Sequence, residues 1–388
     1  MSGEPSIEFL HVNISQRLYV GESIGNHRDW KDSEMASSTS VISLFSGGMG
    51  MDIGLRMAGL DIRVSQDFDR HCVATMKANC CHVVVEGDIK ELFAADPEGR
   101  FLMDPAGLAP GEAFAVVGGP PCQSFSNAGK RLGLQDVRGT LFEEFLKTIT
   151  IARPRFFVME NVAALGSKSM PGVLDMILGL FAGIGYTTVH GVLDASDFGT
   201  PQKRKRLIVI GSRDGEILSL PQATHGEKSA RRLPKMTVRE AIGDLAGREG
   251  PRLKFAQRTL QFIRHVPPGG NWRDLPADMQ RAALGNAFDS GGGKTGFMRR
   301  LPWEGQSPTL VTSPVGRMSL LAHPDEDRPL SVAEYARIQG FPDEWSFQGP
   351  LGARYRQIGN AVAVPMARAI GQHLLRMAAA GPKFEQAA

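Results

Sequence analysis

Cysteine and long apolar runs are both scarce in this sequence. Four cysteines among 388 residues favour a reducing compartment. No apolar run approaches the ~20 residues that a membrane-spanning helix requires. The N-terminal MSGEPSIEFLHVNISQ also lacks the basic-then-apolar pattern of a secretory signal. We therefore predict a cytoplasmic protein with no membrane partner.

A large excess of charge of one sign is also missing. The formal net charge is +3, which is too small to identify a nucleic-acid partner, so any basic surface must be local. Cys72, Cys80 and Cys81 lie near two histidines, but their spacing matches no established metal pattern, and we predict no metal site. Cys122 stands alone, as a catalytic thiol does and as a buried structural thiol also does.

Short apolar runs alternate with longer segments of helical spacing from residue 41 to about residue 211. The runs VISLF, DIRVSQ, HVVVEG, FAVVGG, RFFVME and RLIVIG are bounded by glycine or acidic residues, which is typical of strands. The segments between them, such as GTLFEEFLKTITIA, have the apolar spacing of helices. This alternation predicts an α/β fold with a mostly parallel sheet covered on both faces.

The alternation stops near Gly211. Residues 213 to about 325 are rich in Gly, Pro and Arg and predict a second, smaller and irregular domain. Regularity returns with SVAEYARIQGFPDEW and with the amphipathic IGNAVAVPMARAIGQHLLRMAAA. We predict an N-terminal extension over 1–38, the first part of the sheet domain over 39–215, the second domain over 216–349, and a segment over 350–388 that returns to the first domain.

Five of the predicted strands end in residues that can bind a ligand or react. The turn SGGMG follows the first strand, and the later strands are followed by Asp67, Asp88, Cys122, and Glu160 with Asn161. In open parallel sheets, ligands bind outside the carboxyl ends of the strands. We therefore expect these residues to line one cleft, with a cofactor half and a reactive half.

The cofactor half predicts a ligand that carries a nucleoside. The turn SGGMG gives a loose match to a dinucleotide-binding motif, with Asp67 at a suitable distance to hold a ribose. Asp88 in GDI suits an adenine amino group. A plain tight turn would also explain the glycines, and these features do not distinguish one nucleoside cofactor from another.

The reactive half narrows the choice of cofactor. A thiolate at Cys122 can add to an electron-poor pyrimidine while the carboxyl group of Glu160 protonates a ring nitrogen. The resulting carbanion could attack a methyl sulfonium. A dehydrogenase has no need of such a thiol.

The motif QKRKR, residues 202–206, leads into the apolar run LIVIG. Side chains alternate along a strand, so Gln202, Arg204 and Arg206 are expected on one face. Guanidinium groups near Cys122 would hold a base oxygen and a phosphate. A solvated basic strand end is the alternative.

These motifs, in this order, resemble those of the cytosine-5 DNA methyltransferases that use S-adenosyl-L-methionine, of the bacterial modification-methylase type. LFSGGMGMDIGLRMAGL is similar to their cofactor loop, QDFD and GDI to the next cofactor segments, and GGPPCQSFS to their nucleophile loop. DVRGTLFEE, MENV, QKRKR, RPLSVAEYARIQGFP and YRQIGNAVAVP complete the set. The resemblance covers residues 41 to about 375. It implies a Rossmann-like class I methyltransferase domain and a smaller target-recognition domain.

The resemblance also implies an activity and its residues. A DNA (cytosine-5-)-methyltransferase would transfer a methyl group from S-adenosyl-L-methionine to C5 of a flipped cytosine, through a covalent bond between Cys122 and C6. The implied catalytic residues are Cys122, Glu160, Arg204, Arg206, Pro121 and Asn161. The implied cofactor-binding residues are Phe45, Ser46, Gly47, Gly50, Asp67, Phe68, Asp88, Ile89, Pro120, Leu141, Asn360, Ala361 and Val362.

Double-stranded DNA is the implied substrate. A cytosine inside a duplex cannot present C6 to a thiol and must be flipped out, while basic residues of 213–325 would contact phosphates. The implied DNA-binding residues are Gln123, Ser124, Ser126, Arg138, Gln202, Thr309, Leu310, Arg299 and Arg300. We expect a monomer, with a cognate restriction endonuclease of the same system as a further partner.

Two positions depart from the family pattern. Met49 stands where the cofactor loop usually has glycine, and Ser43 where an acid often precedes the Leu-Phe pair. Both departures concern the methionine end of the cofactor site. Three alternatives are a tRNA cytosine-5 methyltransferase, a catalytically silent DNA-binding relative, and a nicotinamide oxidoreductase, which the thiol loop disfavours.

Overall fold

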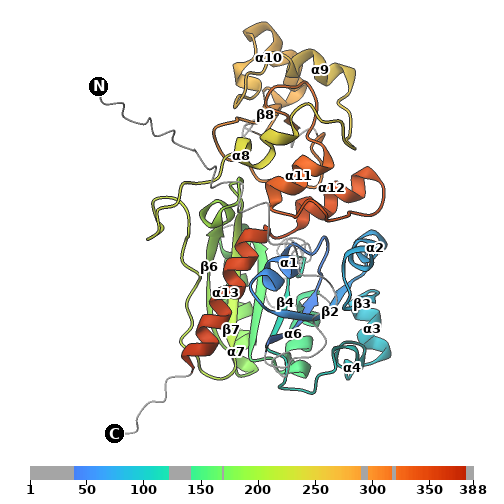
Figure 1. The fold of residues 1–388 in the computed structure, drawn as a ribbon, viewed down its shortest axis with the longest axis vertical. Helices are drawn as coiled ribbons and strands as arrows, with labels where there is room; N and C mark the ends of the chain where they lie inside the picture. The colour runs from blue at the N-terminus through green and yellow to red at the C-terminus, as the bar shows by residue number, and fades with distance from the viewer. Residues whose placement is uncertain (1–38, 122–140, 168–169, 290–295, 317–319, 382–388) are drawn as a thin grey trace, which may run out of the picture. The chain divides into compact units, whose positions relative to one another are not determined.

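The computed structural model describes residues 39–121, 141–167, 170–289, 296–316 and 320–381. Within these residues, one seven-stranded sheet has the order β3-β2-β1-β4-β5-β7-β6 (Figure 1). Its strands are β1 (Ser40–Leu44), β2 (Asp61–Asp67), β3 (Val83–Glu86), β4 (Ala115–Gly118), β5 (Phe156–Val162), β6 (Thr187–Asp194) and β7 (Lys205–Ser212). The first five strands are parallel, and β7 is antiparallel to both of its neighbours. The predicted fold class, an α/β protein with a mostly parallel sheet, is confirmed.

Alternate side chains of the strands enter two separate hydrophobic cores. On one face Ile42 and Phe157 pack with α6 and α7, and on the other Val41 and Phe156 pack with α1 and α13. Strands covered on both faces need continuous apolar runs, which explains sequences such as FFVM in β5. The helices of the sheet region are α1 (Gly50–Met57), α2 (Arg70–Asn79), α3 (Ile89–Ala95), α4 (Arg100–Ala106), α6 (Leu141–Ala152), α7 (Val173–Gly183) and α13 (Val364–Ala380).

The sequence pattern does not predict β6. This strand lies at the edge of the sheet and pairs only with β7. One side of an edge strand is left open, and the side chain of Val192 is 49% exposed. The segment TTVHGVLD therefore lacks the continuous apolar run by which the other strands are recognised.

The residues between β7 and α13 have little regular structure. Their only sheet among the described residues pairs β8 (Arg299–Arg300) with β9 (Leu321–Ala322). Their helices are short, and Thr237 and Ser331 begin two of them with capping boxes. These helices are α8 (Val238–Ile242), α9 (Gln257–Ile263), α10 (Ala277–Leu284), α11 (Val332–Gln339) and α12 (Leu351–Asn360).

Two further hydrophobic cores organise this second region. One lies within it and contains Ile263, Trp272 and Leu284. The other joins Met49 at the start of α1 with residues of α8, α11 and α12, and it includes Leu310. The second core fastens the irregular region to the helices that flank the sheet.

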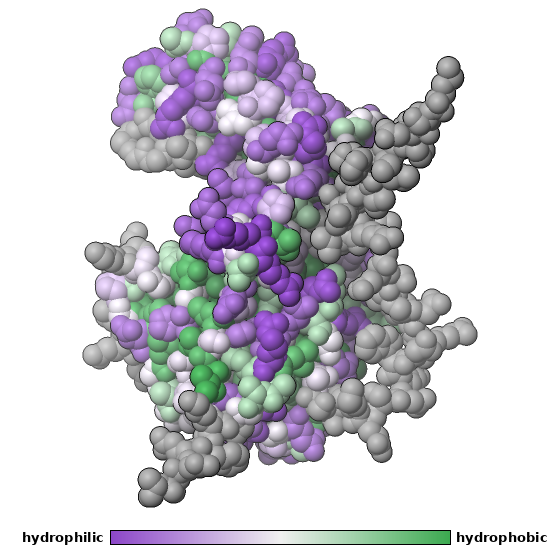
Figure 2. Space-filling view, turned by 60° about the vertical axis from the view of Figure 1, so that its left-hand side comes forward, coloured by the Kyte–Doolittle hydropathy of each residue, from purple (hydrophilic) through white to green (hydrophobic). Residues whose placement is uncertain are grey.

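The hydropathy of the surface differs between the two regions. Figure 2 shows mostly hydrophilic residues over the upper part of the molecule, where α9 and α10 lie, and apolar patches over the sheet region. Within the described ranges, no helix combines the length and the apolarity that crossing a membrane requires.

Candidate active site

Glu160 lies near the carboxyl end of β5 and is held there by an arginine of the neighbouring strand. The Nε of Arg206 lies 2.7 Å from Oε1 of Glu160, and the two side chains are only 14% and 12% exposed. Burial raises the pKa of Glu160, and the positive charges of Arg206 and then Arg204 oppose that rise without cancelling it. A carboxyl group with a raised pKa is suited to holding or donating a proton.

The end of β4 lies directly against Glu160. A Cβ atom on Gly119 would lie 2.9 Å from Oε2 of Glu160, so a larger residue there would displace the carboxylate. The side-chain amide of Asn161 donates to the carbonyl oxygen of Pro120 at 2.9 Å. The structure thus brings the motifs GGPP and MEN together, with Pro121 exposed at the last described position.

Several predicted residues lie outside the described part of the chain. They are Cys122, Gln123, Ser124, Ser126 and Arg138. The described stretch 39–121 therefore ends one position before Cys122, the predicted nucleophile.

The turn after β1 is fixed to the end of β2. The amide of Gly47 donates to Oδ2 of Asp67 at 2.8 Å, and the amide of Asp69 donates to Oδ1 at 2.8 Å. Gly47 has a φ of +54°, a conformation that favours glycine. Burial raises the pKa of Asp67. The neighbouring Phe68 is 67% exposed, which is unusual for a large aromatic side chain.

Further predicted residues lie after β3 and at the start of α6. Asp88 begins α3 and accepts a hydrogen bond from the amide of Lys90 at 2.9 Å, while its side chain is exposed. Ile89 is buried in the core below it. Leu141, at the start of α6, packs against the same core.

The C-terminal segment returns to the turn after β1. A Cβ atom on Gly50 would lie 2.1 Å from the carbonyl oxygen of Val362 and 3.0 Å from Cβ of Ala361. Gly50 is therefore required by this contact, and no bound ligand is needed to explain it. Asn360, the last residue of α12, is exposed and directly precedes Ala361. The motifs SGGMG and GNAV thus meet, as the resemblance implies.

Comparison with known proteins decides the family. A profile of the C-5 cytosine-specific DNA methylases matches residues 39–376. The chain belongs to this family. Its members are DNA cytosine-5 methyltransferases, and the chain is an enzyme of this kind, which requires a methyl donor.

Individual relatives agree with this assignment. The chain is 38% identical over 378 residues to the Type II methyltransferase M.Eco47II of Escherichia coli, covering 93% of this chain and 87% of the relative. It is 37% identical to the Type II methyltransferase M.PspPI of Psychrobacter sp. (strain TA137), covering 90% and 82%. A solved structure of a prophage-encoded E. coli DNA modification methyltransferase has the same fold, with a TM-score of 0.62, 24% identity, and coverage of 88% and 100%.

Met49 occupies the position where this family usually has glycine. Its φ of +68° and ψ of +23° lie in the left-handed region, which explains the preference for glycine. Its side chain is completely buried, and the Sγ of Cys80 contacts its Sδ at 3.3 Å. Packing of a large apolar side chain thus offsets backbone strain of about 1–2 kcal/mol.

Asp52 of helix α1 accepts a hydrogen bond from Ser43, which stands where the family often has an acid. The hydroxyl of Ser43 donates to Oδ1 of Asp52 at 2.6 Å, and the hydroxyl of Ser65 donates to Oδ2 at 2.9 Å. Ser43 also lies 2.8 Å from the hydroxyl of Ser46 in the turn. Asp52 is fully buried, which raises its pKa. The sequence analysis missed this residue, although an acid in an otherwise apolar helical segment was a signal for it.

Arg204 binds backbone carbonyl oxygens inside the fold. It is fully buried and donates to the carbonyl oxygens of Leu310, Gly359 and Ala361 at 3.0, 2.9 and 2.8 Å. Burial lowers its pKa to about 9, which still leaves it charged at neutral pH. Its guanidinium joins chain segments, so Arg206 is the arginine of QKRKR that supports Glu160.

Three predicted DNA contacts are buried inside the protein. Gln202 and Leu310 are 0% and 1% exposed, and the amide of Leu310 donates to Oε1 of Gln202 at 2.9 Å. Arg300 is 5% exposed and donates to the carbonyl oxygens of Ile263, Val266, His323 and Glu326. These geometries argue against direct DNA contact, because the donors are already used inside the fold. The sequence shows that Arg300 is charged and Gln202 is polar, but it does not show that both side chains are buried.

The remaining two predicted DNA-binding residues are more accessible. Thr309 is exposed, and its hydroxyl donates to the carbonyl oxygen of Lys203 at 2.8 Å. Arg299 is half-buried in β8. Burial lowers its pKa.

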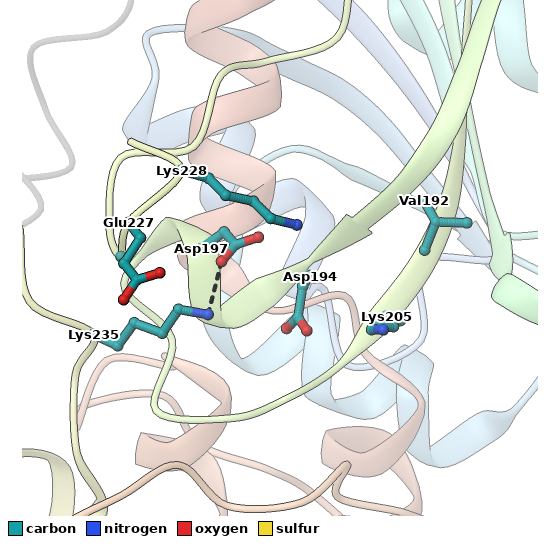
Figure 3. Close-up of a pocket in the computed structure, with 8 residues that line it drawn as sticks. Val192, Asp194, Asp197, Lys205, Glu227, Lys228 and Lys235 are labelled. Atoms are coloured by element: carbon teal, nitrogen blue, oxygen red, sulfur yellow. Dashed lines mark ion pairs between the residues drawn. The ribbon is translucent and has the colours of Figure 1, made fainter. Parts of the chain in front are cut away.

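A cavity of about 610 Å³ is lined by residues of β6, by Lys205 of β7 and by residues between 226 and 235 (Figure 3). Asp194, Asp197 and Glu227 share it with Lys205, Lys228 and Lys235, and Lys235 pairs with Asp197 at 2.8 Å. Three carboxylates balance three ammonium groups, so the cavity offers no net attraction to a phosphate. In the described part of the chain, no three His, Cys, Asp or Glu side chains form a metal-binding group.

Proposed function

We propose that this chain transfers a methyl group from S-adenosyl-L-methionine to C5 of a flipped cytosine in a specific double-stranded DNA sequence, with Cys122 as nucleophile. The observation that carries the proposal is the contact between Glu160 and the end of β4. Gly119 lies against the carboxylate, and Asn161 holds Pro120 by its carbonyl oxygen. The proposed nucleophile follows Pro121 directly in the sequence.

The proposed reaction needs a proton donor at N3 of the cytosine and a nucleophile that reaches C6. The sulfur of Cys122 forms a bond to C6, and the electron pair of the C5–C6 double bond moves toward C5 as Glu160 protonates or hydrogen-bonds N3. Arg206 orients Glu160, and the raised pKa of Glu160 favours its protonated form. After methylation at C5, a solvent base takes the C5 proton, and the C5–H electron pair re-forms the C5–C6 double bond while the sulfur leaves C6 as a thiolate. The N3 proton returns to Glu160.

The residues around the turn after β1 fit an adenosine-containing methyl donor. The carboxylate of Asp67 accepts two backbone amides and retains lone pairs for a ribose hydroxyl. Phe68 offers an exposed aromatic face, and Asp88 an exposed carboxylate, for the adenine. We propose that Phe45, Ser46, Gly47, Ile89, Pro120, Leu141, Asn360, Ala361 and Val362 complete this site. The bound cofactor supplies an electrophilic methyl group.

The DNA substrate would be held mainly through its phosphates, with the base flipped toward Glu160. We propose that residues 216–349 form the target-recognition domain, and that Arg299, Thr309 and the residues near Cys122 approach the duplex. The enzyme would act as a monomer in the cytoplasm, alongside a cognate restriction endonuclease. The relatives named as Type II methyltransferases support this context.

A methyl-transfer assay tests the proposal. Purified protein with radiolabelled S-adenosyl-L-methionine should label bacterial genomic DNA as 5-methylcytosine and should leave tRNA unlabelled. Cys122→Ser should abolish labelling while DNA binding and cofactor binding persist. Turnover by Cys122→Ser would refute the nucleophile assignment, and labelling of tRNA in place of DNA would refute the substrate.

A further inference from the structure

The segment Ser307–Val311 lies along the residues that lead into β7. The amide of Ser307 donates to the carbonyl oxygen of Pro201 at 2.8 Å, and the amide of Lys203 donates to the carbonyl oxygen of Ser307 at 2.8 Å. Gln202 and Ser307 form a parallel β-bridge. The recognition region is thus joined by backbone hydrogen bonds to the strand that carries Arg206.

Two buried glutamines complete the attachment. Gln202 accepts the amide of Leu310 at 2.9 Å and donates to the side-chain oxygen of Gln339 in α11. Gln339 in turn donates to the carbonyl oxygens of Ile358 and Ala361 at 2.9 and 2.7 Å. Both glutamines are 0% exposed. We call this group, Gln202, Arg204, Gln339 and Leu310, the recognition joint.

The segment is also enclosed from its other side. A Cβ atom on Gly359 would lie 2.2 Å from the carbonyl oxygen of Val311, so the two backbone segments are in contact. The hydroxyl of Tyr335 donates to that oxygen at 2.8 Å and accepts from the amide of Val311 at 3.2 Å. These hydrogen bonds fix the segment relative to the sheet, because a hydrogen bond inside a buried network is stronger than one in water.

The joint connects two functions along one short stretch of chain. Arg204 holds the carbonyl oxygen of Leu310, and two residues later Arg206 holds Glu160. Within the segment, Ser307 and Leu310 are buried, whereas Thr309 and Val311 are exposed. The buried side chains anchor the segment, and the exposed ones remain available to DNA.

We propose that Gln202 and Gln339 are positioning residues for sequence specificity, which keep the exposed residues of Ser307–Val311 at a fixed distance from Glu160. This inference rests on the proposed function. Sequence specificity arises when two contacts must form at once. The recognised bases must reach the exposed residues of Ser307–Val311 while the target cytosine reaches Glu160, and the distance between these two sites is fixed. Displacement by about 1 Å can cost on the order of a hundredfold in rate. Loosening the joint would therefore slow the correct site and spare near-correct sites.

Gln202→Met tests the proposal, because it preserves the shape of the side chain and removes both hydrogen bonds. Thr200→Val is the matched control, since Thr200 is equally buried two residues away and its hydroxyl has no partner among the described residues. Each protein is expressed in a host without cytosine methylation, and methylated positions are mapped by bisulfite sequencing. Wild type and Thr200→Val should give one sequence motif.

For Gln202→Met we expect the ratio of correct to single-mismatch methylation to fall by roughly tenfold or more. Cofactor affinity should match that of wild type, which a general loss of structure would not allow. An unchanged motif and ratio in Gln202→Met would overturn the inference and leave the proposed function intact. Absence of methylation by wild type would instead overturn the proposed function.

Hydrogen exchange of the wild-type protein provides a test that needs no variant. The amides of Ser307, Leu310 and Val311 donate to Pro201, Gln202 and Tyr335, in that order. A peptide spanning these residues should be protected to the same degree as one from β7 (Lys205–Ser212). Exchange as rapid as that of the exposed helix α10 would show that the segment is not held, and the inference would fail.

Discussion

The sheet region and the irregular region are stabilised in different ways. In the sheet region, apolar strands are covered by helices on both faces, and functional residues lie where strands end. In the irregular region the strands found among the described residues have two residues each. Buried cations supply much of the order there: Arg300 binds four carbonyl oxygens, and Arg328 pairs with Glu326 and Glu334.

This difference indicates that the residues for catalysis, at the strand ends, and those for sequence recognition, in the irregular region, can change independently of each other. Residues at strand ends inherit their positions from hydrogen-bonded strands, so Glu160 is held in place by β5 and its neighbours. A region held by polar anchors around short helices can alter its loops without disturbing the sheet. Four predictions separate the two regions, beginning with the largest expected effect.

Glu160→Gln should remove the proton-donating carboxyl group and leave the fold intact. We expect methyl transfer to fall by roughly 10²–10⁴-fold, measured as the single-turnover rate on genomic DNA. Glu91→Gln, on the exposed surface of α3, is the control and should behave as wild type. A loss of less than about tenfold in Glu160→Gln would remove Glu160 from proton transfer.

Arg300→Met should destabilise the irregular region without unfolding the sheet. It removes the guanidinium donor from four carbonyl oxygens and from Asp327, although the oxygens of Ile263 and Glu326 keep a backbone amide donor. We expect a loss of about 3–5 kcal/mol in local stability, seen as faster hydrogen exchange over residues 257–300 with β1 and β4 unchanged. Arg258→Met, an exposed change on α9, should have little effect; equal effects of the two substitutions would contradict the anchor role.

At position 49, glycine should be more stable than alanine, the reverse of the usual order. Both substitutions lose the buried Met49 side chain, a cost of about 2–5 kcal/mol for Met→Ala. Only glycine relieves the left-handed strain, worth about 1–2 kcal/mol. Urea unfolding of the two variants measures the difference. A more stable Met49→Ala would show that the backbone there is unstrained.

His82 should make a small contribution to acid sensitivity in the sheet region. Its Nδ1 is buried without a partner among the described residues, and burial lowers the pKa of His82 to about 4. An unfolded histidine titrates near about 6.5, so between these values the unfolded chain binds the extra proton. Stability should therefore fall as the pH drops through this range, by at most about 1.4 kcal/mol per pH unit.

The substitution His82→Gln isolates that contribution. The variant should lose less thermal stability than wild type between pH 6.5 and pH 4.5. Burial also lowers the pKa of His225, His323 and His373, and these act equally in both proteins. Identical pH profiles would mean that His82 is accessible to protons in the folded state.

The sequence predicted the parts of the site that depend on local pattern. Apolar runs ending in Asp67 or Glu160 signal strand ends, and the parallel arrangement then brings those ends to one edge. Burial of charge was not predictable in this way. Arg300 and Gln202 look like surface residues in the sequence, because the groups to which they hydrogen-bond come from segments distant along the chain. Asp52 was missed for the same reason, since its partners Ser43 and Ser65 lie on different strands.

Covalent trapping tests the central claim most directly. A duplex containing the mapped site, with 5-fluorocytosine at the target, cannot lose a C5 proton after methylation, so the bond from Cys122 to C6 should persist. With S-adenosyl-L-methionine present, we expect a denaturation-resistant complex whose crosslinked peptide contains Cys122, and none with Cys122→Ser. A complex attached through another residue, or no complex from an enzyme that methylates the unmodified duplex, would contradict the account.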